Sequence, residues 1–291
     1  MSVDVIAVLT AFNRKEKTIK SLALFERAAK AAGLTYSAVL VDDESTDGTA
    51  QAVEQSYTWV KVIRGKGDLY WCRGMALAVT EALKEESAHI LWLNDDTDLN
   101  ENALRIMSGA GIELKNIYGK SGIIVGCTTS DGGDVSYGGL KSISSFRKFS
   151  YQRVFQEHQS IECDAMNGNA VLITREDVQK IGNLDVKYEH AMGDIDYALM
   201  AKKLGIKIFT APEIVGICGQ NSDKGTSKDV SLGLLTRWDK MLSRKELPPK
   251  SWFHFTFKHG GVLAPLYFIW PYIKFWGQAF KSCRKKMSDC D

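Results

Sequence analysis

The sequence predicts an α/β fold in which a parallel sheet is covered by helices on both faces. Three observations support this prediction. Short apolar runs rich in β-branched residues alternate with segments of helical periodicity. The runs are continuously apolar, as is typical of strands buried on both sides. Polar clusters follow three of them, at 10–13, 42–46 and 95–98. Ligands bind beyond the carboxyl ends of the strands in such sheets, so these clusters are the first candidates for a functional site.

The elements can be assigned in chain order. The run "VDVIAVLT" forms a first strand, and the next segment has apolar residues at helical spacing that end before Gly33, a typical C-terminal cap. The remaining elements of this half are a strand at 36–41, a short helix at 45–56, a strand at 60–63, a helix at 74–86 and a strand at 89–93. In the second half we expect a turn and strand at 166–174, a helix and strand at 193–209, and a mobile loop over the site at 130–161, where periodicity is poor.

Composition limits the class of protein. The chain has 291 residues, of which 45% are hydrophobic and 25% charged, so it is long enough for one large globular domain with an appendage. A net charge of +2 gives no indication of nucleic acid binding. Six scattered cysteines without CxxC spacing indicate reduced thiols rather than zinc. The N-terminus lacks the pattern of an export signal, and we therefore expect a cytoplasmic protein.

The stretch "LWLNDDTDLN" (91–100) sets an apolar strand directly against Asp95, Asp96 and Asp98. One interpretation is a surface turn, in which Asp and Asn bond their own backbone. The other is a cation site, in which clustered carboxylates hold Mg²⁺ or Mn²⁺ against a substrate phosphate. The polar clusters at the other two strand ends favour the cation site. No GxGxxG follows the first strand and no GxxxxGK[ST] occurs, so neither a dinucleotide fold nor a P-loop is indicated.

Five motifs in this order resemble the inverting family 2 glycosyltransferases, which have the GT-A fold: "VLTAFNR", "VLVDDESTDGT", "LWLNDDTDL", "MNGNAVLITRED" and "GDIDYALMAKKLGIKI". The resemblance covers about residues 3–220. It implies a Rossmann-like, mixed and mostly parallel sheet flanked by helices. The segment "GDLYWCRGMALAV" is similar to the subset that acts in bacterial capsule and O-antigen polysaccharide pathways, rhamnosyltransferases among them.

The resemblance also implies which residues bind a nucleotide-diphosphate sugar. The nucleobase and ribose would contact the first two strand ends, and the diphosphate and ribose the "GDLYWCRGM" segment. The residues so assigned are Thr10, Phe12, Arg14, Asp42 and Asp43, and then Asp68, Trp71, Arg73 and Gly74. The charge and forked donors of Arg73 suit a phosphate, while the alternative for Arg73 is a surface ion pair.

The "NDD" turn occupies the position of the family's DxD motif. The resemblance makes Asp96 the ligand of a Mg²⁺ or Mn²⁺ ion, with Asn94 and Asp95 as contacts to the sugar or ribose. We expect Asp98 to cap a helix. Many relatives add a histidine after the next strand; this chain reads "VGICGQNSD" there, which leaves Cys218, Asn221, water or the nearby Lys224 as substitutes.

The catalytic base of the family is the Asp of an "ED" pair, and here the pair reads "GD". Gly193 replaces the first acid, which leaves Asp194 as the proposed base. Glu189 and His190 lie just upstream. A structural interpretation of Asp194 also exists, because acids in the first turn of a helix interact favourably with its dipole. We expect Asp196 to brace the helix or the site loop.

The C-terminal segment 236–291 differs in character from the preceding domain, 1–235. It is basic, crowded with Trp, Phe and Tyr, and broken by prolines, and its longest apolar piece is too short to span a bilayer. We expect amphipathic helices that lie in the interface of an anionic membrane. The alternatives are that the aromatic residues cover the catalytic domain or form a homodimer contact.

The functional hypothesis is an inverting, metal-dependent glycosyltransferase at the cytoplasmic face of the cell membrane. It would move a sugar from a UDP- or dTDP-sugar, with dTDP-rhamnose as one case, to a polyprenyl-diphosphate-linked glycan. Two alternatives are a nucleotidyltransferase and a non-catalytic sugar-nucleotide-binding subunit of a polysaccharide assembly complex.

Overall fold

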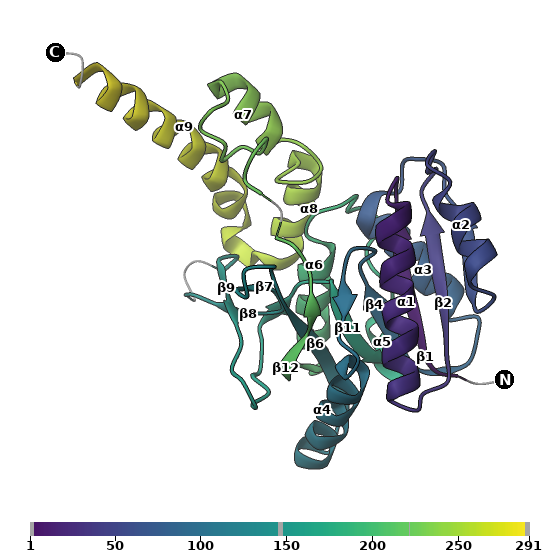
Figure 1. The fold of residues 1–291 in the computed structure, drawn as a ribbon. Helices are drawn as coiled ribbons and strands as arrows, with labels where there is room; N and C mark the ends of the chain where they lie inside the picture. Colours follow the sequence, from purple (N-terminus) through teal and green to yellow (C-terminus); the bar gives the residue numbers. More distant parts are fainter. Residues whose placement is uncertain (1–2, 145–147, 221, 289–291) are drawn as a thin grey trace. The chain divides into compact units, whose positions relative to one another are not determined.

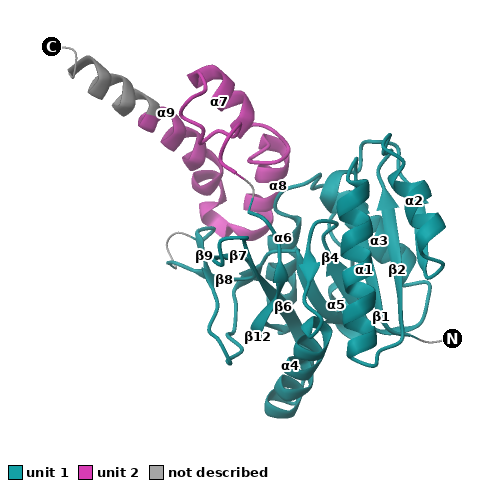
Figure 2. Cartoon of the chain, in the orientation of Figure 1, with its two compact units in different colours: residues 1–220 teal, residues 221–291 magenta. Residues whose placement is uncertain are grey.

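The computed structural model describes residues 3–144, 148–220 and 222–288 (Figure 1). The chain divides into two compact units, residues 1–220 and 221–291, which are described separately below (Figure 2). The sequence placed the domain boundary at residue 235. In the structure residues 222–235 group with the C-terminal unit.

The first unit is built on a nine-stranded sheet in the order β3-β2-β1-β4-β11-β6-β12-β5, with β7 paired to β6. Strands β1, β2, β3, β4, β6 and β12 run in one direction, and β5, β7 and β11 run against them. This confirms the predicted mixed, mostly parallel sheet. The strand bounds are β1 Val3–Ala11, β2 Tyr36–Asp42, β3 Val60–Arg64, β4 Ser87–Leu93, β5 Asp98–Leu99, β6 Gly122–Thr129, β7 Val135–Tyr137, β11 Ala170–Thr174 and β12 Lys207–Ile217.

Helices cover both faces of this sheet. Alternate residues of β1 point to opposite sides: Val5, Ala7 and Leu9 pack against Leu22 and Phe25 of α1 in one core cluster. The other side of β1 and β2 packs against α3. Because both faces are buried, the strands read as continuous apolar runs in the sequence. The helices are α1 Lys15–Ala31, α2 Thr49–Ser56, α3 Tyr70–Ala82, α4 Ala103–Tyr118, α5 Arg175–Ile181 and α6 Gly193–Lys203.

Three expectations about local structure differ from the structure. Helix α3 begins at Tyr70 rather than at residue 74. Asp98 does not cap a helix: it lies in β5, opposite Ile217 of β12, and its carboxylate accepts a hydrogen bond from Lys20 Nζ at 2.6 Å. The acidic turn leads into this short edge strand, and α4 begins later, at Ala103.

The third difference is the segment predicted as a mobile loop, 130–161. It contains β7 and two further strands, β8 Gly139–Ser142 and β9 Tyr151–Val154. These two form a three-stranded antiparallel sheet with β10 Ala165–Met166. The strands are too short and too polar to produce a periodic signal in the sequence. Residues 145–147 of the segment lie outside the described part of the chain.

The C-terminal unit is helical. It comprises α7 Leu234–Met241, α8 Pro249–His259, the 3₁₀ turn η1 Gly261–Leu263 and α9 Ala264–Ser288. Pro249 occupies the first turn of α8, where its missing N–H costs no hydrogen bond. Trp238 of α7 packs against Tyr272 and Phe275 of α9, with ring centroids 5.9 and 5.3 Å apart. Among the helices of the described chain, none combines the length and the apolar character that a bilayer crossing needs.

Candidate active site

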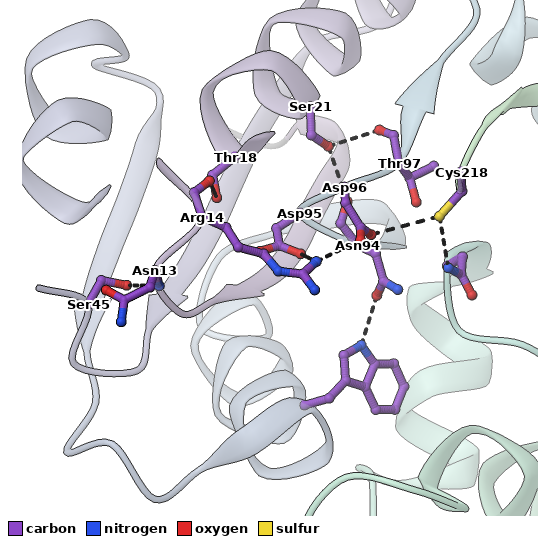
Figure 3. Close-up of polar contacts among 12 residues, drawn as sticks. Asn13, Arg14, Thr18, Ser21, Ser45, Asn94, Asp95, Asp96, Thr97 and Cys218 are labelled. Carbon is purple, nitrogen blue, oxygen red and sulfur yellow. Dashed lines mark hydrogen bonds and ion pairs between the residues drawn. The ribbon is translucent and has the colours of Figure 1, made fainter. Parts of the chain in front are cut away.

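The polar clusters at the ends of β1, β2 and β4 lie together and are joined by hydrogen bonds (Figure 3). The backbone N–H of Asn13 donates to Ser45 Oγ at 2.8 Å, which connects the loops after β1 and β2. Ser21 Oγ of α1 donates to the carbonyls of Asn94 and Thr97, at 3.1 and 3.0 Å, which connects α1 to the acidic turn after β4. The polar loops that follow these three strands therefore adjoin at one edge of the sheet, as parallel strands predict.

Arg14 binds both acids of the "NDD" turn. Its Nη1 lies 3.2 Å from Asp95 Oδ1 and 2.6 Å from Asp96 Oδ2 (Figure 3). The Asp95 side chain is only 10% exposed, whereas that of Asp96 is 22% exposed. Burial raises the pKa of Asp95 to about 7, and the neighbouring charge of Arg14 opposes this rise. The sequence assigned Arg14 to the nucleobase and ribose, and the structure adds this ion pair.

Trp71 connects the acidic turn to the segment that carries the proposed base. Its indole Nε1 donates to Asn94 Oδ1 at 2.8 Å. Its ring lies against Gly168, where a Cβ atom would come within 2.5 Å of Trp71 Cζ2. At Gly193 a Cβ atom would overlap Cys72 Sγ. The space at residue 193 is thus filled from α3, which explains why a glycine stands where the family pattern has a glutamate.

Asp194 lies in the first turn of α6 and directly follows Gly193. Its Oδ1 accepts from the N–H of Ile195 at 2.8 Å, and its Oδ2 from the N–H of Gly168 at 3.2 Å. Burial raises the pKa of Asp194 against the opposing effect of these hydrogen bonds. A raised pKa makes its carboxylate a better proton acceptor. The preceding Met192 has φ 75°, a strained conformation of the kind that accumulates at functional sites.

Asp196 is the brace that the sequence suggested. It is 3% exposed, and its Oδ1 accepts a hydrogen bond from the hydroxyl of Tyr188 at 3.0 Å. This bond fixes α6 to the segment that precedes it.

Asp43 organises the loop between β3 and α3. Its carboxylate accepts from the backbone N–H groups of Gly67, Leu69 and Tyr70, at 2.9, 2.9 and 3.0 Å. Asp43 therefore caps α3 from a strand end 27 residues away. Asp42 has a similar local role, because its Oδ1 accepts from Ser45 N at 3.2 Å. Both aspartates therefore hold loop backbone in place, and their contact with a nucleotide stays a prediction.

Three other residues assigned to the donor fall into two groups. Phe12 is 55% exposed and Asp68 is also exposed, so both are accessible to a ligand. Gly74 instead permits close packing of α3 on β1, since a Cβ atom there would overlap the Thr10 hydroxyl. Of these assignments, the contact of Gly74 with a ligand has the least support from the packing.

Arg73 makes its contacts with the segment before α6. Its Nε donates to the carbonyl of Val186 at 3.0 Å, and its Nη2 lies 3.6 Å from Glu189 Oε1. This is the ion-pair alternative for Arg73. A diphosphate contact by the same side chain remains a prediction.

Cys218 lies where the sequence lacks the family's histidine. Its thiol donates to Asp96 Oδ1 at 3.8 Å and accepts from Asn169 Nδ2 at 3.4 Å. Burial raises the pKa of Cys218 to about 11. Of the other two candidates, Asn221 lies outside the described residues and Lys224 belongs to the C-terminal unit.

Asp95 and Asp96 can supply only part of the ligand set of a divalent ion. Among the residues that the structure describes, no three His, Cys, Asp or Glu side chains gather as a metal centre. The two carboxylates already bind one cation, the guanidinium of Arg14. Mg²⁺ is often held by one or two carboxylates, with substrate phosphates and water as the other ligands. The pair therefore fits an ion that arrives together with a diphosphate.

The sequence predicted the "NGN" turn before β11 but assigned none of its residues to the site. Gly168 donates its N–H to Asp194, and Asn169 bonds Cys218. The carbonyl of Asn169 also accepts from Asn94 N at 2.9 Å. The sequence does indicate a functional turn here, because a polar, glycine-containing stretch directly precedes an apolar strand. Only the fold shows that this turn contacts Asp194, Cys218 and Asn94.

Comparison with known proteins decides the family. The sequence profile described as glycosyl transferase family 2 matches residues 6–176, more than half of the chain. The chain belongs to this family. The matched region includes every strand end of the site up to β11, and it ends before Asp194. A search of curated proteins found no match.

Solved structures similar to this family 2 protein share its GT-A fold at low sequence identity. They include S. aureus TarS 1–349, with 13% identity and TM-score 0.52 over 74% of this chain and 60% of that one. GalNAc-T7 with UDP, GalNAc and Mn²⁺ has 13% identity and TM-score 0.54 over 75% and 43%. The mannosyltransferase PcManGT from Pyrobaculum calidifontis, with GDP-Man and Mn²⁺, has 15% identity and TM-score 0.50 over 92% and 68%. This chain thus spans less than two thirds of the length of the TarS chain.

Proposed function

We propose that this protein is an inverting glycosyltransferase that uses a nucleotide-diphosphate sugar. One observation carries the proposal: Trp71 connects the acidic turn at Asn94 to the turn that holds Asp194. A diphosphate-binding element and a candidate base thereby adjoin one site, in a chain of family 2. Release of a nucleoside diphosphate from the donor by the purified chain tests the proposal.

The chemistry follows from the positions of these groups. Asp194 takes the proton of an acceptor hydroxyl as its oxygen bonds to the anomeric carbon of the donor. The bond from that carbon to the diphosphate breaks at the same time, and the nucleoside diphosphate leaves with both electrons. A Mg²⁺ or Mn²⁺ ion on Asp96, beside Asp95, would neutralise charge on the leaving diphosphate when bound. Attack from the face opposite the leaving group inverts the anomeric configuration.

The donor and acceptor are proposed in finer detail from the resemblance of the "GDLYWCRGM" segment. We infer a UDP- or dTDP-sugar as donor, with dTDP-rhamnose as one case. The acceptor would be a polyprenyl-diphosphate-linked glycan of a capsule or O-antigen pathway. The exposed Phe12 at the end of β1 is available to stack on the nucleobase.

A membrane location is supported by the distribution of charge. Residues 249–288 contain seven Lys and Arg and no Asp or Glu, whereas the other 251 residues contain 30 and 35. In the same segment several large apolar side chains are exposed, among them Val262 at 96%, Trp270 at 63% and Leu266 at 62%. A basic surface with exposed apolar residues suits the interface of an anionic bilayer. The cytoplasmic face is the proposed location, because the N-terminus lacks the pattern of an export signal.

We expect the purified chain to sediment with vesicles that contain anionic phosphatidylglycerol and much less with neutral phosphatidylcholine vesicles. Trp270→Ser with Leu266→Ser should weaken this binding about tenfold, because two anchoring side chains are lost. Ile112→Ser, which changes an equally exposed residue of α4, is the matched control. Absence of binding to anionic vesicles at low salt would contradict the proposal. A dimer that dissociates in the double variant would indicate the homodimer alternative.

Two other activities predict different products. A nucleotidyltransferase would release pyrophosphate from a nucleoside triphosphate, and a non-catalytic subunit would bind a donor without releasing a nucleoside diphosphate. No feature of the described site favours either one over sugar transfer.

A further inference from the structure

The carboxylates that suit a divalent ion are already occupied by a side chain of the same protein. Arg14 precedes the first residue of α1 and is held at the end of β1. It reaches across 82 residues of sequence to Asp96. Its guanidinium contacts one oxygen of each acid, Asp95 Oδ1 and Asp96 Oδ2 (Figure 3).

This ion pair has a consequence for metal binding. A divalent ion needs carboxylate oxygens with free lone pairs, and the 2.6 Å bond from Arg14 engages the more accessible acid, Asp96. A guanidinium and a metal ion close to the same carboxylates would also repel each other. Arg14 must therefore move, at least from Asp96, before an ion can bind there by Oδ2.

The geometry points to a competition: we propose that Arg14 and the divalent ion compete for Asp95 and Asp96, and that the diphosphate of the nucleotide relieves this competition. The inference rests on the proposed donor. The oxygens of a diphosphate offer the guanidinium a new bidentate partner, since its forked donors match phosphate as well as carboxylate. The Arg14 side chain is 42% exposed, so it has room to turn toward a ligand.

The competition makes two ligands cooperative. Without nucleotide, a metal ion must displace Arg14 and gains only the two carboxylates. With nucleotide, Arg14 has an alternative anion, and the ion gains phosphate ligands as well. Because such coupling is reciprocal, the ion must strengthen nucleotide binding by the same factor. Arg14 is in this sense a positioning residue that offsets part of the negative charge of the acid pair until the donor arrives.

The test is a titration of Mn²⁺ followed by the electron paramagnetic resonance signal of the free ion. Wild type and Arg14→Gln are compared without nucleotide and with UDP, dTDP or GDP. We expect Arg14→Gln to bind Mn²⁺ alone about tenfold more tightly than wild type, a difference of about 1.4 kcal/mol. The gain in Mn²⁺ affinity on adding nucleotide should be smaller in the variant. Arg14→Lys, which keeps a charge but loses the fork, should fall between the two.

Two controls make the result specific. Arg27→Gln removes an arginine within α1 that pairs with Glu101, and it should leave Mn²⁺ affinity unchanged. Asp96→Asn should abolish Mn²⁺ binding in both the wild-type and the Arg14→Gln backgrounds. Thermal melting of each variant verifies that it is folded.

The competition is overturned if Arg14→Gln and Arg14→Lys, both folded, bind Mn²⁺ alone no more tightly than wild type. Failure of the proposed donor class looks different, because then none of the three nucleoside diphosphates binds wild type. In that case the coupling to nucleotide is also wrong, while the comparison in Mn²⁺ alone still decides the competition.

Discussion

Replacing Asp194 with asparagine is expected to lower the rate of sugar transfer about 1,000-fold while nucleotide affinity changes by no more than a few fold. The amide cannot take the proton of the acceptor hydroxyl. Its single oxygen can keep the hydrogen bond from the N–H of Gly168, which holds the side chain to the preceding turn, but not also the one from the N–H of Ile195. The contact between this turn and α6 should therefore persist. Initial rates of nucleoside diphosphate release, together with the dissociation constant of the same nucleotide, measure the two effects separately.

Asp196→Asn is the matched control for this prediction. It changes an acid two residues away that braces Tyr188 and does not face Gly168, so it should lower thermal stability more than turnover. A proton acceptor must also be ionised, and burial raises the pKa of Asp194. Wild-type kcat/KM should accordingly decline as the pH falls through that raised pKa, above the ordinary value of about 3.9. Turnover by Asp194→Asn within a few fold of wild type would remove Asp194 from the mechanism.

Trp71→Ala is expected to have the largest effect on stability. Its indole fills the space beside Gly168 and Gly193, where the absence of side chains leaves nothing to collapse into the cavity. Loss of a packed tryptophan costs about 3 kcal/mol, which lowers the melting temperature of a unit of this size by roughly 6 to 12 °C. The acidic turn also loses its link to the segment of Asp194, so transfer should fall together with stability. Calorimetry and donor turnover check both effects.

Trp71→Phe separates packing from hydrogen bonding. Phenylalanine retains most of the packed surface but cannot donate to Asn94 Oδ1. We expect a loss of about 1 kcal/mol, the net value of one hydrogen bond, with a smaller effect on turnover than in the alanine variant. Equal melting temperatures for wild type and Trp71→Ala would show that the indole does not hold the site together.

The fold and the meeting of the polar strand ends could be predicted from the sequence because both depend on local patterns. Continuous apolar runs specify strands buried on both faces, and the carboxyl ends of parallel strands must meet at one edge. The clusters after β1, β2 and β4 therefore had to adjoin. The resemblance to family 2 added the family, which the matched profile then confirmed.

The contacts within the site could not be predicted, because they join residues far apart in sequence. Arg14 meets Asp95 across 81 residues, and Asp43 caps α3 from the end of β2. In the sequence, Gly193 is a departure from the family pattern, which has an acid at this position. Only the packing of Cys72 against it shows that α3 fills the space of the missing side chain. The interpretation of Asp98 as a helix cap was wrong because pairing with β12 overrode a local preference.

The most direct test of sugar transfer is the release of nucleoside diphosphate by the purified full chain. Wild type and Asp194→Asn would be incubated with Mn²⁺, a bacterial lipid extract and, separately, UDP-, dTDP- and GDP-sugars. We predict that wild type releases the nucleoside diphosphate of one class and places its sugar in the lipid fraction, and that Asp194→Asn does neither above background. Release of pyrophosphate from nucleoside triphosphates, or no release from any donor by folded protein, would contradict the proposed function.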